Sequence, residues 1–142
     1  MKKSGSAVWK GSMREGQGTI STQTGVLRDA PYGFKARFED GPGTNPEELL
    51  GAAHAACFSM ALSMILGNEN LTADRIATKA DVSLEKVDDG FAITAVHLTV
   101  SAKVPGTDAT TFESLAQKAK VGCPVSKVLN AKITMDATLE SA

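Results

Sequence analysis

The sequence predicts an α+β protein in which short strands precede a helix in each of two halves, residues 1–68 and 69–142. Two patterns favour this class. Apolar residues alternate with polar ones over short runs in both halves, and an uncharged segment at residues 49–66 has the length and composition of a buried helix. A chain of 142 residues has the length of one ordinary domain, so we expect residues 1–142 to form a single domain.

The first elements should be three strands joined by turns. Runs of β-favouring residues occupy positions 7–9, 18–21 and 34–38, and glycine and proline separate them. Residues 30–40 therefore include the predicted third strand, which ends close to the next chain break.

A long helix should follow the Gly-Pro-Gly break at residues 41–43. Asn45 can cap it, Pro46 suits its first position, and the two glutamates that come next complement the positive end of the helix dipole. We expect the helix to run to about Leu66 and to stop at the Gly-Asn pair that follows.

This helix predicts a homodimer. Residues 49–66 contain no Lys, Arg, Asp or Glu, so the helix should be buried on all sides. The strands of one small domain can cover only about half of it, and a two-fold dimer would cover the rest. Residues 51–53, Gly-Ala-Ala, would let two such helices approach closely. The alternative is a monomer whose core helix simply consists of good helix formers.

The second half should open with an antiparallel hairpin, because alternating runs at 80–85 and 96–104 flank an Asp-Asp-Gly turn at 88–90. An amphipathic helix should follow and end at Gly122. Its apolar residues at helical spacing are Phe112, Leu115, Ala116 and Ala119. Pro124 then opens a short turn, and alternation over residues 133–139 predicts a last strand.

The two cysteines differ in setting. Cys57 lies within the apolar helix, which predicts a buried thiol, whereas Cys123 lies in a Gly-Cys-Pro break that should be more mobile and open to a reductant. We expect the chain in the cytoplasm, because no segment resembles a signal peptide and no run approaches about 18 apolar residues. A disulfide there is more often transient and catalytic than structural.

Composition excludes several function classes. The net charge is −1, from 15 basic and 16 acidic residues without runs, which argues against nucleic acid or an anionic membrane as partner. Cys57, Cys123, His54 and His97 match the ligand count of a zinc site, but none falls in C-x-x-C or H-x-x-x-H spacing. We expect no metal and no bound cofactor.

Two long motifs resemble the OsmC/Ohr family of thiol peroxidases: residues 43–58, GTNPEELLGAAHAACF, and residues 122–126, GCPVS. The resemblance covers essentially the whole chain, and residues 31–38 point to the branch of osmotically inducible proteins. It implies an intertwined homodimer in which antiparallel sheets wrap around long central helices. It also implies reduction of organic hydroperoxides as an antioxidant activity in oxidative and osmotic stress.

The resemblance further implies residue roles. Cys57 matches the peroxidatic cysteine, Cys123 the resolving cysteine, Arg37 the active-site arginine and Glu47 its carboxylate partner. The family suggests a dihydrolipoyl-type dithiol as reductant, and the chain has no third cysteine to take that role.

The chemistry needs these residue types on its own terms. Attack on a peroxide requires a thiolate, and an apolar helix would raise the pKa of Cys57. A cation must therefore lie nearby, and we expect Arg37, at the end of a strand, to donate to the thiolate and the peroxide oxygen while Glu47 orients it. The sulfenic acid formed on Cys57 would then condense with Cys123 to a disulfide.

Helix geometry predicts that the site is shared between subunits. Glu47 and Cys57 are ten positions apart, roughly 15 Å along one helix. In an antiparallel pair with its axis near Ala52, residue 47 of one chain lies level with residue 57 of the other. Glu48 lies about 180° around the helix from Cys57, against about 80° for Glu47, so Glu48 should serve as a capping residue.

Two other functional hypotheses stay open. His54 precedes Cys57 by three residues on one helix face, so a Cys-His hydrolase is conceivable, although a packed core histidine is the simpler interpretation and no oxyanion-hole loop is recognisable. A non-catalytic dimer that senses oxidants or binds an apolar ligand would need the same cysteines without turnover.

Overall fold

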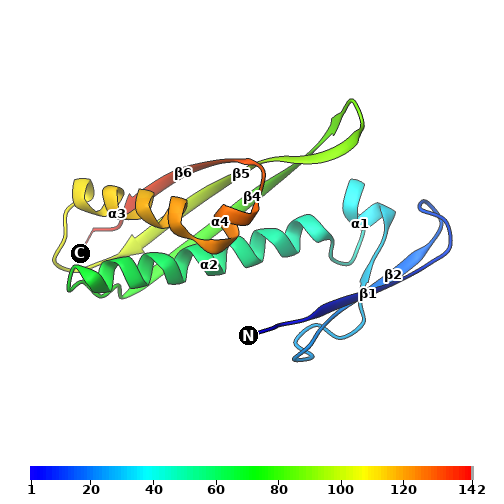
Figure 1. Cartoon of the computed structure of the whole chain (residues 1–142), viewed down its shortest axis with the longest axis horizontal. Coiled ribbons are helices and arrows are strands. Elements are labelled where there is room, and N and C mark those ends of the chain that lie inside the picture. The colour runs from blue at the N-terminus through cyan, green and yellow to red at the C-terminus, as the bar shows by residue number, and fades with distance from the viewer. Residues whose placement is uncertain (142) are drawn as a thin grey trace. The chain divides into compact units, whose positions relative to one another are not determined.

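A computed structural model describes residues 1–141, which form two compact units that divide between Leu49 and Leu50. The first unit contains three strands and a short helix, and the second contains the remaining helices and a second sheet (Figure 1). The division falls inside one long helix rather than at residue 68, where the sequence pattern places the boundary between halves.

The first unit is a three-stranded antiparallel sheet in the order β1, β2, β3. Its strands are β1 (Gly5–Lys10), β2 (Gln17–Thr22) and β3 (Ala30–Tyr32). Trp9 and Tyr32 lie on the outer strands with ring centroids 5.3 Å apart, and Gly18 sits between them where a side chain would collide with both rings. The glycine thus allows the aromatic pair to close over the middle strand.

The predicted strand at 34–38 is wrong, because this segment is a short helix, α1 (Phe34–Phe38), and the third strand is β3. The pattern is ambiguous: Phe34, Ala36 and Phe38 alternate, but the two phenylalanines are also four residues apart and meet on a helix with ring centroids 5.0 Å apart. The side-chain amide of Asn45 donates to the Ala36 carbonyl at 2.9 Å, and this hydrogen bond connects the short helix to the residue that precedes the next helix.

The long helix α2 (Pro46–Asn68) begins where predicted and ends two residues later than expected. Asn45 Oδ1 accepts the backbone N–H of Glu48 at 2.7 Å, so the predicted cap is confirmed. By length and composition alone α2 could cross a membrane, a test that the core helix of a soluble protein also passes.

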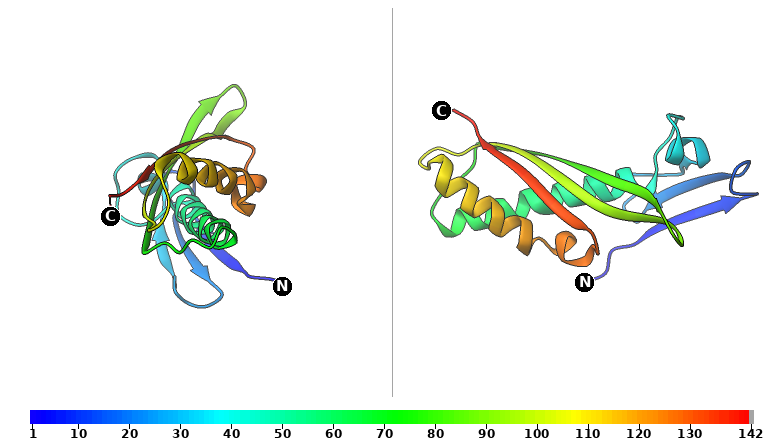
Figure 2. Two further views of the ribbon diagram at one scale, coloured as in Figure 1. Left: turned by 90° about the vertical axis from the view of Figure 1, so that its left-hand side faces the viewer. Right: turned by 90° about the horizontal axis from the view of Figure 1, so that it is seen from above.

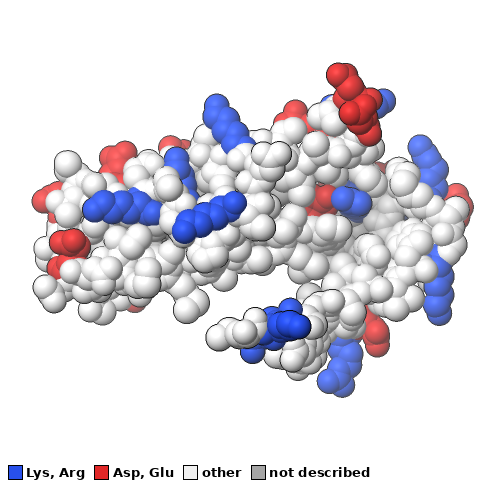
Figure 3. All heavy atoms as spheres, viewed as in Figure 1, with Lys and Arg blue, Asp and Glu red and all other residues white. Residues whose placement is uncertain are grey.

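Within the single chain α2 is covered on one side only, in line with the expectation that one domain covers about half of this helix. One face is covered: Gly51, His54, Phe58, Leu62 and Leu66 are buried at intervals of three or four residues. The opposite side, which we call the alanine–methionine face, is exposed and mostly uncharged in Figure 3. Its residues are Ala52, Ala53, Ala56, Met60, Ser63, Met64 and Gly67.

Gly51 does not belong to that face, which corrects its predicted role in helix pairing. A Cβ at this position would lie 3.0 Å from the carbonyl oxygen of Ala80 and 3.6 Å from Val82 Cγ2. The glycine therefore lets α2 approach the sheet of its own chain. A matched position, Gly67, has open space where its Cβ would be.

We expect Gly51→Val to lower the free energy of unfolding by about 1–3 kcal/mol, because the backbone of Ala80 cannot move aside cheaply. Gly67→Val, in the same helix, should cause no comparable loss. Thermal or urea unfolding of both variants measures the difference, and equal stabilities would contradict the close contact.

The second unit packs two helices against a mixed sheet (Figure 2). The predicted hairpin is confirmed as β4 (Arg75–Val87) and β5 (Gly90–Lys103). Helix α3 (Ala109–Gly122) also lies where predicted, and the segment expected as a short turn after Gly122 is a short helix, α4 (Pro124–Val128). The last strand, β6 (Lys132–Leu139), pairs with β5 in parallel. The expectation of an antiparallel sheet is therefore wrong for this pair. The chain passes through α3 and α4 after β5, and this crossover returns it to the end of the sheet at which β5 begins.

Burial is unequal in the two units. The core of the second unit combines residues of α2, β5 and α3 that are almost fully buried: Phe58, Leu62, Leu66, Val96, Leu98, Val100, Ala102, Phe112, Ala116 and Ala119. In the first unit only Gly18, Ala36 and Glu47 are buried, and every residue of β1 is exposed. The first sheet therefore lacks the cover that a stable sheet needs.

Candidate functional site

The candidate residues occur in two groups, one in each unit. Arg37 and Glu47 form an ion pair in the first unit, and Cys57 and Cys123 lie together in the second. We describe each group by itself.

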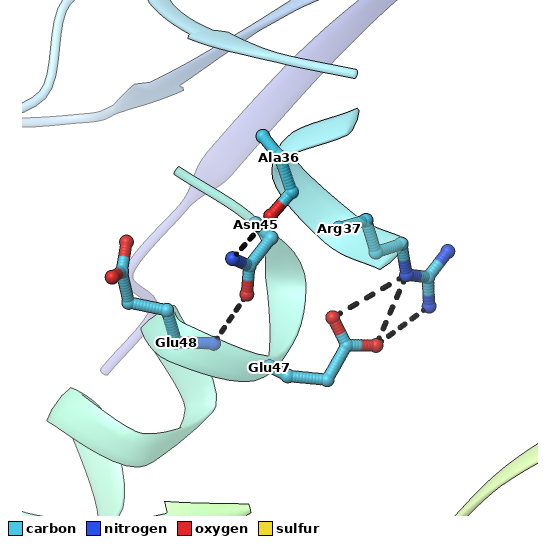
Figure 4. Close-up of polar contacts among 5 residues, drawn as sticks. All are labelled: Ala36, Arg37, Asn45, Glu47 and Glu48. Carbon is cyan, nitrogen blue, oxygen red and sulfur yellow. Dashed lines mark hydrogen bonds and ion pairs between the residues drawn. The ribbon is translucent and has the colours of Figure 1, made fainter. Parts of the chain in front are cut away.

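The ion pair joins α1 to the first turn of α2 (Figure 4). Arg37 Nε donates to both carboxylate oxygens of Glu47, at 3.1 and 3.3 Å, and Nη2 donates to Oε1 at 2.8 Å. The Glu47 side chain is 10% exposed, whereas that of Arg37 is 39% exposed. The carboxylate thus fixes one edge of the guanidinium and leaves the rest accessible to a further acceptor. Arg37 lies on a helix rather than at the end of a strand, which corrects its predicted setting.

The neighbouring acid has a different role. The carboxylate of Glu48 accepts the Thr44 hydroxyl at 2.7 Å, and its backbone N–H donates to Asn45. Glu48 is therefore engaged at the start of α2, as its predicted capping role requires, and Glu47 is the acid that pairs with Arg37.

The two thiols are free and lie within hydrogen-bonding reach of each other. Cys57 comes from α2, and Cys123 is the residue between α3 and α4. Their burial is the reverse of the expectation: Cys123 is fully buried, and Cys57 is only partly buried. Only the cysteine of the Gly-Cys-Pro break turns inward: Cys123 belongs to the core cluster, whereas Gly122 and Pro124 are exposed.

Burial raises the pKa of Cys57 and its hydrogen bond to Cys123 raises it further, and a hydrogen bond from the backbone N–H of Val125 offsets these effects only in part. Burial also opposes ionisation of Cys123, but hydrogen bonds from Cys57, from the backbone N–H groups of Ser126 and Val125 and from the Ser126 hydroxyl outweigh it, so the pKa of Cys123 is lowered. The second unit by itself therefore favours the thiolate on Cys123. Ionisation of Cys57 needs a positive group from outside these contacts.

His54 is a core histidine, in line with the simpler interpretation. It is fully buried on α2, and its Nε2 lies 2.7 Å from Ser126 Oγ, while its Nδ1 is buried without a partner. Burial lowers the pKa of His54, so the ring is neutral at neutral pH. No local sequence pattern points to Ser126, because the histidine that it contacts lies 72 residues away in the chain.

The remaining candidates are structural. His97 lies on β5, with Nδ1 2.6 Å from Thr134 Oγ1 and Nε2 3.1 Å from the carboxylate of Asp136 on β6. Within residues 1–141, no three His, Cys, Asp or Glu side chains are grouped so that they could hold a metal ion.

Comparison with known proteins identifies relatives along the whole chain. A family model described as OsmC-like protein matches residues 39–138. A protein of Escherichia coli (strain K12), "Peroxiredoxin OsmC", is 60% identical over 139 residues, which cover 98% of this chain and 97% of the relative. "Organic hydroperoxide resistance protein OhrA" of Bacillus subtilis (strain 168) is 38% identical over 101 residues, 70% of this chain and 67% of the relative.

Solved structures show the same fold. The crystal structure of the organic hydroperoxide resistance protein OhrB of Bacillus subtilis aligns with a TM-score of 0.70 at 27% identity, covering 94% of this chain and 97% of that one. An OsmC-like protein of unknown function from Vibrio cholerae aligns with a TM-score of 0.76 at 17% identity, covering 96% and 99% of the two chains. At that identity the second match concerns the fold alone.

Proposed function

This chain belongs to the OsmC-like protein family, and from that premise we propose that it is a thiol peroxidase that reduces organic hydroperoxides to alcohols. The observation that carries the proposal is the contact between Cys57 and Cys123, two free thiols close enough to share a hydrogen bond. Relatives named for organic hydroperoxide resistance favour that substrate class.

In the proposed cycle the Cys57 thiolate attacks one peroxide oxygen. The O–O bond breaks, the alkoxide takes up a proton to leave as an alcohol, and Cys57 becomes a sulfenic acid. The Cys123 thiolate then attacks the sulfenic sulfur, forming the disulfide and releasing hydroxide, which is protonated to water. An external dithiol of the dihydrolipoyl type reduces the disulfide and is itself oxidised.

Cys57 is assigned the first step because this residue is only partly buried, whereas Cys123 is fully buried. Its raised pKa makes a cation necessary. Arg37 suits this task, because Glu47 holds one edge of its guanidinium and the other side is accessible. It would stabilise both the thiolate and the departing alkoxide.

We propose that the working unit is a homodimer in which each site combines Cys57 and Cys123 of one chain with Arg37 and Glu47 of the other. Two observations support it: the alanine–methionine face of α2 is exposed and uncharged, and the sheet of the first unit has almost no cover. In this arrangement residues 1–142 act as one OsmC-like domain, cytoplasmic and used in oxidative or osmotic stress.

Of the two alternative functions, the hydrolase loses support from the contacts of His54. A Cys-His hydrolase needs His54 as a base for Cys57, but the polar partner of His54 is Ser126 and its pKa is lowered. A non-catalytic redox sensor would use the same thiol pair, and turnover distinguishes it from the proposed enzyme.

Thiol titration tests the proposal. After one equivalent of cumene hydroperoxide, reactive thiols should fall from two per chain to nearly none, because oxidation of Cys57 consumes Cys123 as well. With excess dihydrolipoamide, hydroperoxide should be consumed continuously. Retained thiols would support a hydrolase and exclude the peroxidase, and oxidation without turnover would leave only a sensor.

A further inference from the structure

A buried line of polar groups leads away from the reactive thiols. His54 Nε2 contacts the Ser126 hydroxyl at 2.7 Å, the Ser126 hydroxyl contacts the Cys123 sulfur, and Cys123 contacts Cys57. His54 and Cys123 are fully buried and Ser126 is 8% exposed. Burying an imidazole and a hydroxyl has a substantial free-energy cost unless their hydrogen bonds are used, so this pairing calls for an explanation beyond packing.

The contacts favour one arrangement of protons. The imidazole is neutral, so one ring nitrogen carries hydrogen and the other accepts. A proton on Nε2 can be donated to Ser126 Oγ, which frees the Ser126 hydroxyl hydrogen for the sulfur and leaves Nδ1 as the unpaired atom. A proton on Nδ1 would instead bury an unused donor and draw the serine hydrogen toward His54.

We propose that His54 is a positioning residue that turns the Ser126 hydroxyl toward Cys123, so that the serine stabilises the thiolate form of the resolving cysteine. This inference rests on the proposed function and extends it to two residues of the second unit. The backbone N–H groups of Val125 and Ser126 point to the same sulfur, so the serine hydroxyl completes a set of three donors from α4.

The donor set would act twice in the cycle. First, Cys123 as a thiolate attacks the Cys57 sulfenic sulfur, so the S–S bond forms, the S–O bond breaks, and hydroxide leaves and is protonated to water. Second, a thiolate of the dithiol reductant attacks the sulfur of Cys57, the less buried of the two cysteines, and the electron pair of the S–S bond passes to Cys123. The Ser126 hydroxyl stabilises that sulfur both as nucleophile and as leaving group.

Other ionisable groups have little access to this sulfur. Besides Cys57 and the buried, neutral His54, both on α2, the charged or titratable residues of the second-unit elements around Cys123 lie at the surface or are half-buried. They are Glu113, Lys118 and Lys120 of α3, Lys127 of α4, Lys132 and Asp136 of β6, His97 and Lys103 of β5, and Arg75, Lys79, Asp81, Glu85 and Lys86 of β4. Hydrogen bonds rather than a neighbouring cation therefore set the ionisation of Cys123 in this chain.

The pKa of Cys123 tests the inference. Titration of thiolate absorbance at 240 nm in a Cys57→Ser background leaves one thiol to observe and needs no solvent access. Ser126→Ala should raise the pKa of Cys123 by about one unit or more, the usual worth of a hydrogen bond to a charged acceptor. His54→Leu should raise it in the same direction, whereas His54→Gln, which keeps a donor at the position of Nε2, should restore most of the original value.

An unchanged pKa in Ser126→Ala would overturn the proposal, and so would equal values for His54→Leu and His54→Gln. Circular dichroism verifies that each variant is folded, and Ser126→Ala is the test that remains if a change at His54 prevents folding. In a Ser126→Ala chain that keeps both cysteines, stopped-flow mixing with hydroperoxide should show disulfide formation about tenfold slower than in the wild-type chain, whereas the rate of sulfenic acid formation should stay the same. The absorbance titration does not require peroxidase activity, so failure of the proposed function and failure of this inference give different results.

Discussion

Cys57→Ser should abolish hydroperoxide turnover, with a loss of at least about 1,000-fold in kcat/KM, because a serine hydroxyl is far too weak a nucleophile to cleave a peroxide. Cys123→Ser should behave differently. Its Cys57 still attacks the peroxide, so each chain consumes one equivalent and stops at the sulfenic acid unless the reductant reaches it directly. Stopped-flow consumption of cumene hydroperoxide, with trapping of the sulfenic acid by dimedone and mass spectrometry, measures both outcomes.

The two serine variants are matched controls for each other, because each removes one sulfur from the same contact. Dimedone should label residue 57 in Cys123→Ser and nothing in Cys57→Ser. Label on residue 123 instead would exchange the two roles. Such an exchange is physically reasonable, because the contacts within the second unit favour the thiolate on Cys123.

The order of the two thiols therefore depends on what the second chain supplies. Within one chain, burial and the hydrogen bond to Cys123 hold the pKa of Cys57 above its usual value. A guanidinium beside Cys57 would reverse that order by stabilising its thiolate. The rate of hydroperoxide consumption should then rise with pH as Cys57 ionises, and Arg37→Met should move this rise to higher pH.

Local patterns made most elements predictable. The start of α2 follows from Asn45 and Pro46, and the β4–β5 hairpin follows from alternation around the Asp-Asp-Gly turn that ends at Gly90. Residues 34–38 were not predictable in the same way, because a five-residue segment with aromatic residues at both ends satisfies the strand period and the helical spacing at once. The direction of β6 depends on where the preceding helices return the chain, which periodicity does not encode.

In the candidate site, too, some features could be predicted from the sequence and others could not. The match of Glu47 to Arg37 could be expected from the motif and from helix geometry, and the structure forms that ion pair. The burial of Cys123 could not, because Gly122 and Pro124 indicate a break in the helix but not the side to which the sulfur turns. Ser126 was missed for a related reason: its importance comes from a contact with His54 that only the fold creates.

Glu47→Ala should lower kcat/KM by about 10- to 100-fold, because Arg37 loses the carboxylate that fixes its guanidinium. The Glu48→Ala variant is the matched control, since Glu48 binds Thr44 and lies at the adjacent position of the same helix turn. It should weaken the start of α2 slightly and leave kcat/KM within about threefold of the wild-type value.

Mixing the inactive Cys57→Ser chain with the weakly active Glu47→Ala chain then tests whether the site is shared. If Arg37 and Glu47 act on the cysteine of the other chain, a mixed dimer has one site with every group intact and one site with both defects. Random exchange at equal concentrations makes half of the dimers mixed, so activity should recover to about one quarter of the wild-type rate per chain. If all four residues act within one chain, every site keeps one defect. Activity that stays at the mean of the two parent variants, after mass spectrometry of the intact dimers has demonstrated exchange, would therefore place the whole site in a single chain.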